Sequence, residues 1–284
     1  MYGRHLLMEG RMKSIVSRAF QTILAISMLV MAGNASSAEF QTREAALVAL
    51  KEYNQLIAAE PNFAVLYTLR GDAYYTLNDL HGAVENYAHA IKLDAKQDQA
   101  YYGRGMALGR MGLVDEGIAD LSVFIQRHPD SSVAYTKRGV RNIWRNNLVE
   151  AERDLTRAVQ LDPSNAEAHD DLGVVHAKNN RIQQAAQHFS TAIRLDPSYQ
   201  KAYHNLAICY HMTGQNPKAL EIVDAGLLLD PDSRGTLMLK STILHTMGMT
   251  EEAKKIEERA EFLPESNWTE RSEVGMASTQ GEAK

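Results

Sequence analysis

Residues 166–199 read AEAHDDLGVVHAKNNRIQQAAQHFSTAIRLDPSY, and residues 200–233 read QKAYHNLAICYHMTGQNPKALEIVDAGLLLDPDS. The two stretches adjoin and are equal in length, so Leu172 corresponds to Leu206 and a Leu-Asp-Pro triplet stands near the end of both. A constant period of about 34 residues is typical of one helical hairpin copied along a solenoid. The sequence therefore predicts an all-α fold built from repeated helix pairs.

The same period continues on both sides of this stretch. Small residues recur at repeat positions 8, 20 and 27, and large apolar residues recur at positions 4, 11 and 24. The small residues let two antiparallel helices approach closely, and the large ones fill the space between them. A single hairpin cannot cover its apolar face, so neighbouring hairpins must stack. The predicted copies are 64–97, 98–131, 132–165, 166–199 and 200–233, with a half repeat or cap helix at 39–63 and a degenerate copy at 234–267.

These residues resemble the tetratricopeptide repeat family. In residues 166–199 the family pattern is matched by Leu172, Gly173, Ala185, Phe189, Ala192 and Pro197. The resemblance covers roughly residues 40–264 and implies an α-solenoid of antiparallel helix pairs. It also implies a non-catalytic scaffold without a cofactor, which binds a peptide or a helix of another protein in a concave groove.

Two oppositely charged residues stand at a fixed spacing in two of the copies. Arg104 and Arg138 occupy repeat position 7, and Asp120 and Asp154 occupy position 23 of the same copies. We expect Arg–Asp pairs that join helices within or between repeats. The alternative is that arginine is merely tolerated there, with its stem packed and its charged end in water.

The start of the chain, over 1–38, differs from the rest. Four basic residues precede a mostly apolar run over 19–33, which is followed by Asn-Ala-Ser-Ser-Ala at 34–38. This order predicts a secretory signal peptide that is cut after Ala38. Signal and repeats together resemble exported bacterial envelope assembly proteins, which implies a periplasmic location. The alternative is a membrane-anchored assembly factor that keeps 19–38 as a transmembrane helix, since a bilayer needs about 20 apolar residues.

The charge balance argues against two classes of partner. The net charge of the chain is −5, and loss of residues 1–38 removes four basic residues and one acidic residue, which leaves −8. Such acidity disfavours nucleic acid and anionic lipid as partners. We expect a protein partner, no small-molecule substrate, and membrane contact only if the signal is retained. Homo-oligomerisation stays open.

The remaining features of the chain predict packing rather than chemistry. Cys209 is the only cysteine, and its place within a first helix predicts a small buried hydrophobe rather than a reactive thiol. Residues 268–284 are polar and lack a helical pattern, so we expect a disordered tail. Trp268 in this tail either docks on the last repeat or lies free.

The resemblance places the groove at first-helix positions 2, 5, 9, 12 and 13. Aromatic residues there offer large contact area at low entropic cost, as binding hot spots do. For Trp144, packing against the neighbouring helix is the competing interpretation. The predicted protein contacts are Tyr75, Tyr102, Trp144, Lys178, Lys201 and His204.

A third interpretation, a metal-dependent accessory enzyme, rests on histidines. His204 and His211 lie two helical turns apart on one helix face, and His245 shares the repeat position of His211. Helical metal pairs need the shorter i, i+4 spacing, as in H-E-x-x-H, so we predict no metal site. Asp170 and Asp171 are adjacent and expected to point to different sides of their helix, so they predict no catalytic carboxylate pair.

Overall fold

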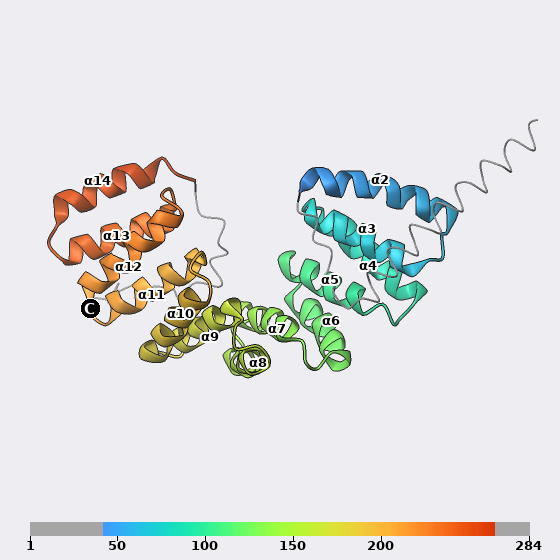
Figure 1. Cartoon of the computed structure of the whole chain (residues 1–284), viewed down its shortest axis with the longest axis horizontal. Coiled ribbons are helices and arrows are strands. Elements are labelled where there is room, and N and C mark those ends of the chain that lie inside the picture. The colour runs from blue at the N-terminus through green and yellow to red at the C-terminus, as the bar shows by residue number, and fades with distance from the viewer. Residues whose placement is uncertain (1–41, 265–284) are drawn as a thin grey trace, which may run out of the picture. The chain divides into compact units, whose positions relative to one another are not determined.

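The computed structural model describes residues 42–264, which form thirteen α-helices and no strand (Figure 1). The helices lie in two compact units: unit 1 ends at Arg127 and unit 2 begins at His128. Unit 1 contains α2 (Arg43–Ala59), α3 (Ala64–Thr76), α4 (Leu80–Leu93), α5 (Asp98–Arg110) and α6 (Val114–Arg127). Unit 2 contains α7 (Ser132–Trp144), α8 (Leu148–Leu161), α9 (Ala166–Lys178), α10 (Ile182–Leu195), α11 (Gln200–Met212), α12 (Asn216–Leu229), α13 (Arg234–Thr246) and α14 (Thr250–Glu261).

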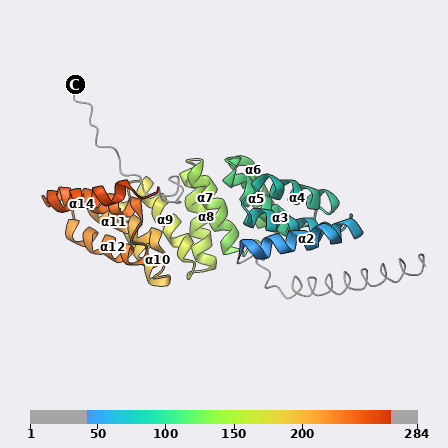
Figure 2. The ribbon, with the colours of Figure 1, turned by 90° about the horizontal axis from the view of Figure 1, so that it is seen from above.

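The helices are paired, and the pairs recur at a constant interval. The first helices begin at positions 64, 98, 132, 166, 200 and 234, so the interval from each pair to the next never changes. A three-residue turn joins each first helix to its second helix, so the two run antiparallel (Figure 2). Within each unit the second helix of a pair packs on the first helix of the next pair. The predicted all-α architecture of antiparallel helix pairs is therefore confirmed.

Glycine at repeat position 8 allows the two helices of a pair to come close. A Cβ added to Gly173 would lie 2.6 Å from Cε1 of Phe189, and one added to Gly139 would lie 2.7 Å from Cγ of Leu155. Phe189 and Leu155 occupy position 24, and both are fully buried. The small and large residues of the sequence pattern thus face each other across the pair, as predicted.

The turns within the pairs share one backbone feature. The middle residue of each three-residue turn has a positive φ, a left-handed conformation that Asn and Gly adopt at the lowest cost. Its φ lies between 59° and 85° in every pair of the described chain. These residues are Asn78, Gly112, Asn146, Asn180, Gly214 and Gly248.

The Leu-Asp-Pro triplets end three of the second helices. The last helical residues of α8, α10 and α12 are the leucines, and the aspartate that follows is extended in each case. Proline restricts the residue before it and lacks an amide hydrogen, so the helix stops there. The aspartate side chain then accepts a hydrogen bond from a nearby backbone N–H, as Asp162 does from Ser164 at 2.9 Å.

The Arg–Asp pairs are present, and they lie within single repeats. Arg104 Nε and Nη2 donate to the carboxylate of Asp120 at 2.7 and 2.8 Å, and Arg138 binds Asp154 in the same bidentate way. This geometry joins the first helix to the second helix of each pair. Cys209 is 1% exposed, as predicted, and burial raises the pKa of its thiol to about 12.

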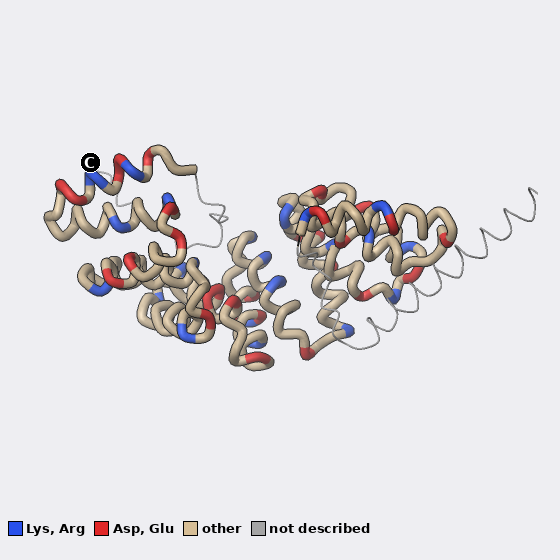
Figure 3. Tube along the Cα trace, turned by 45° about the horizontal axis from the view of Figure 1, so that its top comes forward, with Lys and Arg blue, Asp and Glu red and all other residues tan. Residues whose placement is uncertain are grey.

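Several predictions concern parts of the chain outside residues 42–264. These are the signal peptide 1–38, the retained helix 19–38, the tail 268–284 and the docking of Trp268. Over the residues that the structure does describe, no helix combines the length and the apolar character that a membrane span requires. Acidic and basic residues alternate along α14, the last described helix (Figure 3).

Candidate functional site

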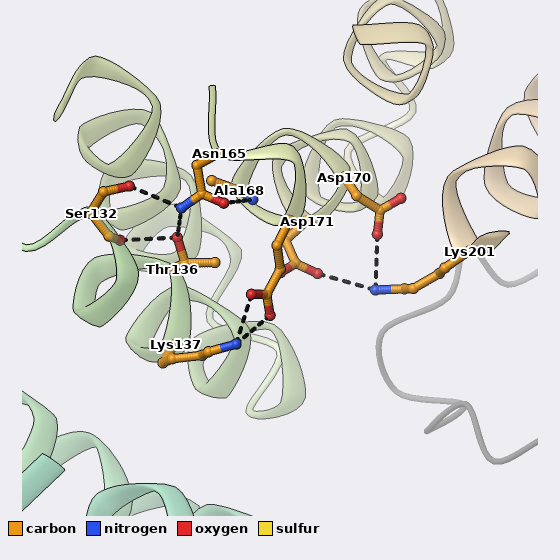
Figure 4. Close-up of polar contacts among 9 residues, drawn as sticks. Ser132, Thr136, Lys137, Asn165, Ala168, Asp170, Asp171 and Lys201 are labelled. Carbon is orange, nitrogen blue, oxygen red and sulfur yellow. Dashed lines mark hydrogen bonds and ion pairs between the residues drawn. The ribbon is translucent and has the colours of Figure 1, made fainter. Parts of the chain in front are cut away.

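The first helices of unit 2 are joined by a row of polar contacts between successive repeats. At its start, Asn165 Nδ2 donates to the hydroxyls of Ser132 and Thr136 at 2.9 and 3.2 Å. Asn165 Oδ1 accepts the backbone N–H of Ala168 at 2.9 Å and so caps α9 (Figure 4). One side chain therefore caps one first helix and binds the preceding one.

Ion pairs continue this row along α7, α9 and α11. Lys137 Nζ donates to both carboxylate oxygens of Glu167 at 2.6 and 2.7 Å. Lys201 Nζ lies 2.9 Å from Asp170 Oδ2 and 3.2 Å from Asp171 Oδ1 (Figure 4). The two aspartates, which we expected to point to different sides of α9, are thus both bound by one lysine of the next repeat.

This second ion pair is deeply buried and carries an excess negative charge. The side chains of Asp170 and Asp171 are 0% and 2% exposed, and that of Lys201 is 16% exposed. Burial raises the pKa of Asp171 to about 7, although the Lys201 charge opposes this shift. Burial alone would lower the pKa of Lys201, but both carboxylates outweigh it and hold that pKa well above its ordinary value. Asn205 Nδ2 supplies a further donor to Asp170 Oδ1 at 3.0 Å.

Four of the six predicted contact residues are at least partly exposed. Tyr75, Tyr102 and Trp144 are half-buried, and Lys178 at the end of α9 is exposed. An arginine guanidinium lies over each of two of these rings. The guanidinium carbon of Arg110 is 5.0 Å from the centroid of the Tyr75 ring, and that of Arg141 is 4.7 Å from the centroid of the Trp144 ring. Tyr102 packs on Phe124 of its own pair, with ring centroids 5.2 Å apart.

The other two predicted contacts, Lys201 and His204, lie inside unit 2. Lys201 is occupied by the two buried aspartates, and His204 is 7% exposed, with Nδ1 3.3 Å from the Thr236 hydroxyl. Burial lowers the pKa of His204 to about 4. Their side chains link repeats, so the prediction of direct partner contact rests on the remaining four residues.

The three histidines considered as metal ligands have separate partners. His204 contacts Thr236, His211 Nδ1 contacts Asn216 Oδ1 at 2.8 Å, and His245 Nε2 contacts Glu257 at 3.0 Å. Across residues 42–264, no group of three or more His, Cys, Asp or Glu side chains is placed to hold a metal ion.

A cluster of three histidines, which the sequence pattern did not predict, lies between α9 and α10. Nδ1 of His169 and Nδ1 of His188 are 3.1 Å apart, and the ring of His176 stacks on that of His188 with centroids 5.1 Å apart. Burial and the two neighbouring histidines lower the pKa of His188 to about 4. The cluster is therefore neutral at pH 7, with charged Arg194 near His169 and the Arg181–Glu152 pair near His176.

The variant His188→Gln is expected to make stability less sensitive to acid. Because the native pKa of His188 lies below 6.5, the unfolded chain takes up its proton first, and stability is lost as the pH falls from 6.5 toward 4. For a half-buried side chain this loss is on the order of 1–2 kcal/mol. Urea unfolding at pH 7 and pH 5 should show a smaller difference for the variant. Equal differences in both proteins would contradict the prediction.

A surface pocket of about 670 Å³ is formed by α7 and α8. It is lined by Tyr135 and Arg138 of α7 and by α8 residues that include Val149, Arg153 and Arg157. None of the six predicted contacts lines it. It therefore does not identify the predicted binding face.

Sequence comparison finds one repeat family along the chain. Models described as tetratricopeptide repeat match residues 99–131, 145–199 and 176–243, and one described as TPR repeat matches 71–112. No curated protein sequence matches this chain significantly.

Several solved structures share the fold. The APC/C hetero-tetramer Cut9-Hcn1 matches with a TM-score of 0.70 and 17% identity, over 85% of this chain and 49% of the other. This chain thus spans about half of that protein. A tetratricopeptide repeat protein from Parabacteroides merdae matches with a TM-score of 0.66 and 16% identity, over 88% and 95% of the two chains. YrrB, a TPR protein with an unusual peptide-binding site, matches with a TM-score of 0.52 and 23% identity, over 66% and 97%. At these identities the likeness shows the fold alone.

Proposed function

This chain belongs to the tetratricopeptide repeat family, and we propose that it is a non-catalytic scaffold of the cell envelope. The residues at positions 2, 5, 9, 12 and 13 of the first helices form a surface that we call the first-helix face. This face holds a peptide or a helix of a partner protein. Repeats of this kind serve protein–protein interaction, and stacked hairpins present extended surfaces for that purpose. The envelope location, the occupied face and the absence of catalysis are parts of the proposal.

The observation that carries the proposal is the set of half-buried aromatic rings on the first helices. Tyr75, Tyr102 and Trp144 lie on α3, α5 and α7, each with one part packed and another part exposed. Hot spots of protein interfaces are enriched in such residues because they bury much area with few rotatable bonds. YrrB, which has this fold, has an unusual peptide-binding site, and this is consistent with a peptide on a face of such an array.

Affinity capture from the cell envelope tests the binding face. The doubly substituted variant Tyr102→Ala/Trp144→Ala should recover less than a tenth of a partner that the wild type enriches, since each hot-spot residue contributes about 2 kcal/mol. The matched control is Val149→Ala/Leu228→Ala, which removes apolar atoms that are 77% and 84% exposed on second helices. The control should recover the partner as the wild type does. Equal recovery by both double variants would refute the assignment of this face.

The proposed location has a separate test. We expect export to the periplasm with an N-terminus at Glu39, which the mass of the mature chain measures directly. A chain that keeps residues 19–38 and fractionates with the membrane would favour the anchored assembly factor instead. In either case the partner on the first-helix face is a protein.

A further inference from the structure

Asp72 lies on the first-helix face of unit 1, and its carboxylate has no counter-ion in the described part of the chain. It occupies repeat position 9 of α3, with Thr68 one turn before it and Tyr75 one turn after it. Its Oδ1 accepts a hydrogen bond from the Tyr87 hydroxyl at 2.7 Å. Within residues 42–264, Asp72 forms no ion pair with a lysine or an arginine. Asp72 is half-buried, so its charge is partly removed from water without a counter-ion and yet stays within reach of a ligand.

The surroundings of Asp72 include tyrosine rings, and the neighbouring repeat packs closely on one of them. Tyr53 of α2 lies close enough for the Asp72 charge to raise the pKa of its hydroxyl, after the larger effect of burial. On the α5 side stands Gly103, where an added Cβ would lie only 2.7 Å from Tyr87 Oη. The α5 backbone thus packs directly on the Tyr87 ring, which holds this ring and its hydroxyl in place beside Asp72.

Two further observations around Asp72 point to a ligand with donors and positive charge. The Thr68 hydroxyl is buried, with the residue 4% exposed, and it has no hydrogen-bond partner within the described chain. Tyr75 already holds a cation: the Arg110 guanidinium carbon lies 5.0 Å from the ring centroid, and Arg110 donates to Asn78 Oδ1 at 2.6 Å. Aromatic faces attract cations most strongly where water is partly excluded.

We propose that Asp72 is the counter-ion for a lysine or arginine side chain of the segment that binds the first-helix face of unit 1. The ammonium or guanidinium group forms an ion pair with the carboxylate, packs its stem against the tyrosine rings, and donates to the Thr68 hydroxyl. This inference rests on the proposed function, because it concerns the chemistry of the segment bound at that face. An anionic ligand is repelled at this position, and a single carboxylate offers too few ligands for a metal ion.

The proposed ion pair also predicts how binding depends on pH. Burial raises the pKa of Asp72 to about 7, although the Tyr87 hydrogen bond opposes the shift. The titratable groups that interact with Asp72 are the hydroxyls of Tyr53 and Tyr87, and burial together with the Asp72 charge raises the pKa of both above the ordinary tyrosine value near 10. The ionised fraction of Asp72 therefore rises about tenfold between pH 6 and pH 8, and the affinity for a basic peptide should rise by up to that factor.

Selection of random peptides displayed on phage by the full chain tests the proposal. The wild type should enrich peptides with a lysine or arginine at one fixed position, and replacing that residue by methionine should weaken binding at pH 8 at least tenfold. The variant Asp72→Asn keeps an acceptor for Tyr87 and should lose this enrichment. The matched control Glu116→Gln makes the same charge change on the exposed face of α6 and should retain it. Thermal unfolding of each variant checks the fold.

The outcomes separate this inference from the proposed function. Peptides that need Tyr102 and Trp144 but show no basic preference overturn the Asp72 assignment and leave the scaffold function standing. Peptides that bind the Tyr102→Ala/Trp144→Ala variant as well as the wild type overturn the binding face itself. If Asp72→Asn does not fold, the methionine-substituted peptide and the pH dependence of the wild type still decide. Affinity that is equal at pH 6 and pH 8 overturns the proposal.

Discussion

Replacing Lys201 by methionine is expected to lower the free energy of unfolding at pH 8 by about 3–5 kcal/mol, the range seen when one partner of a buried ion pair is removed. The substitution leaves Asp170 and Asp171 adjacent, with 0% and 2% of their side chains exposed, and without a positive charge between them. Burial already raises the pKa of Asp171 to about 7, and loss of the Lys201 charge removes an effect that opposes this shift, so the loss of stability should shrink as the pH falls toward 5. Urea unfolding at pH 8 and pH 5 measures both effects.

Lys137→Met is the matched control for this prediction. Lys137 forms the corresponding ion pair one repeat earlier, but its partner Glu167 is 39% exposed, so the loss should stay within about 1 kcal/mol. The triple variant Lys201→Met/Asp170→Asn/Asp171→Asn should recover much of the stability, since no buried charge is left unpaired. If Lys201→Met and Lys137→Met are equally stable, the excess charge is not as deeply buried as the structure indicates.

Phe189→Ala should destabilise unit 2 by about 3–5 kcal/mol, because it removes a large buried ring from between α9 and α10 and leaves a cavity there. Phe189 is fully buried, and its ring occupies the space that a Cβ at Gly173 would enter. The double variant Gly173→Ala/Phe189→Ala should therefore be more stable than Phe189→Ala alone, since the new methyl group fills part of the cavity. Thermal and urea unfolding measure these differences.

Leu228→Ala gives the baseline for this comparison. Leu228 is an apolar residue on the second helix of the next pair, but it is 84% exposed, so its loss should change stability by less than about 0.5 kcal/mol. A loss for Phe189→Ala no larger than that of Leu228→Ala would show that the two helices do not pack through this ring.

Much of the fold could be predicted because its determinants repeat at a fixed interval. That single period placed Gly173 opposite Phe189 and Gly139 opposite Leu155 without any knowledge of distance. The constant spacing from Arg138 to Asp154, shared by the preceding copy, likewise indicated a pair that joins helices. The boundary between the two units, at Arg127 and His128, could not be predicted from the sequence pattern, because the period continues unchanged across it.

The polar row on the first helices was harder to predict. Lys201 and His204 stand at positions expected to face a partner, and position alone does not tell whether a neighbouring repeat covers them. A usable signal existed: Lys137 with Glu167, and Asp171 with Lys201, are opposite charges at one and the same sequence separation. The histidine cluster gave no such signal, because its members are spaced irregularly and meet only after α9 and α10 pair.

The reversal of sign between these two ion pairs has a consequence for how the chain can evolve. Removal of residues 166–199 in register would keep every remaining turn and helix pair, but it would bring Lys137 opposite Lys201. Two like charges would then meet where attraction is needed. The copies share one backbone conformation but cannot be exchanged freely. Recombination that changes their order would place like charges opposite each other at the new junctions and so destabilise the array.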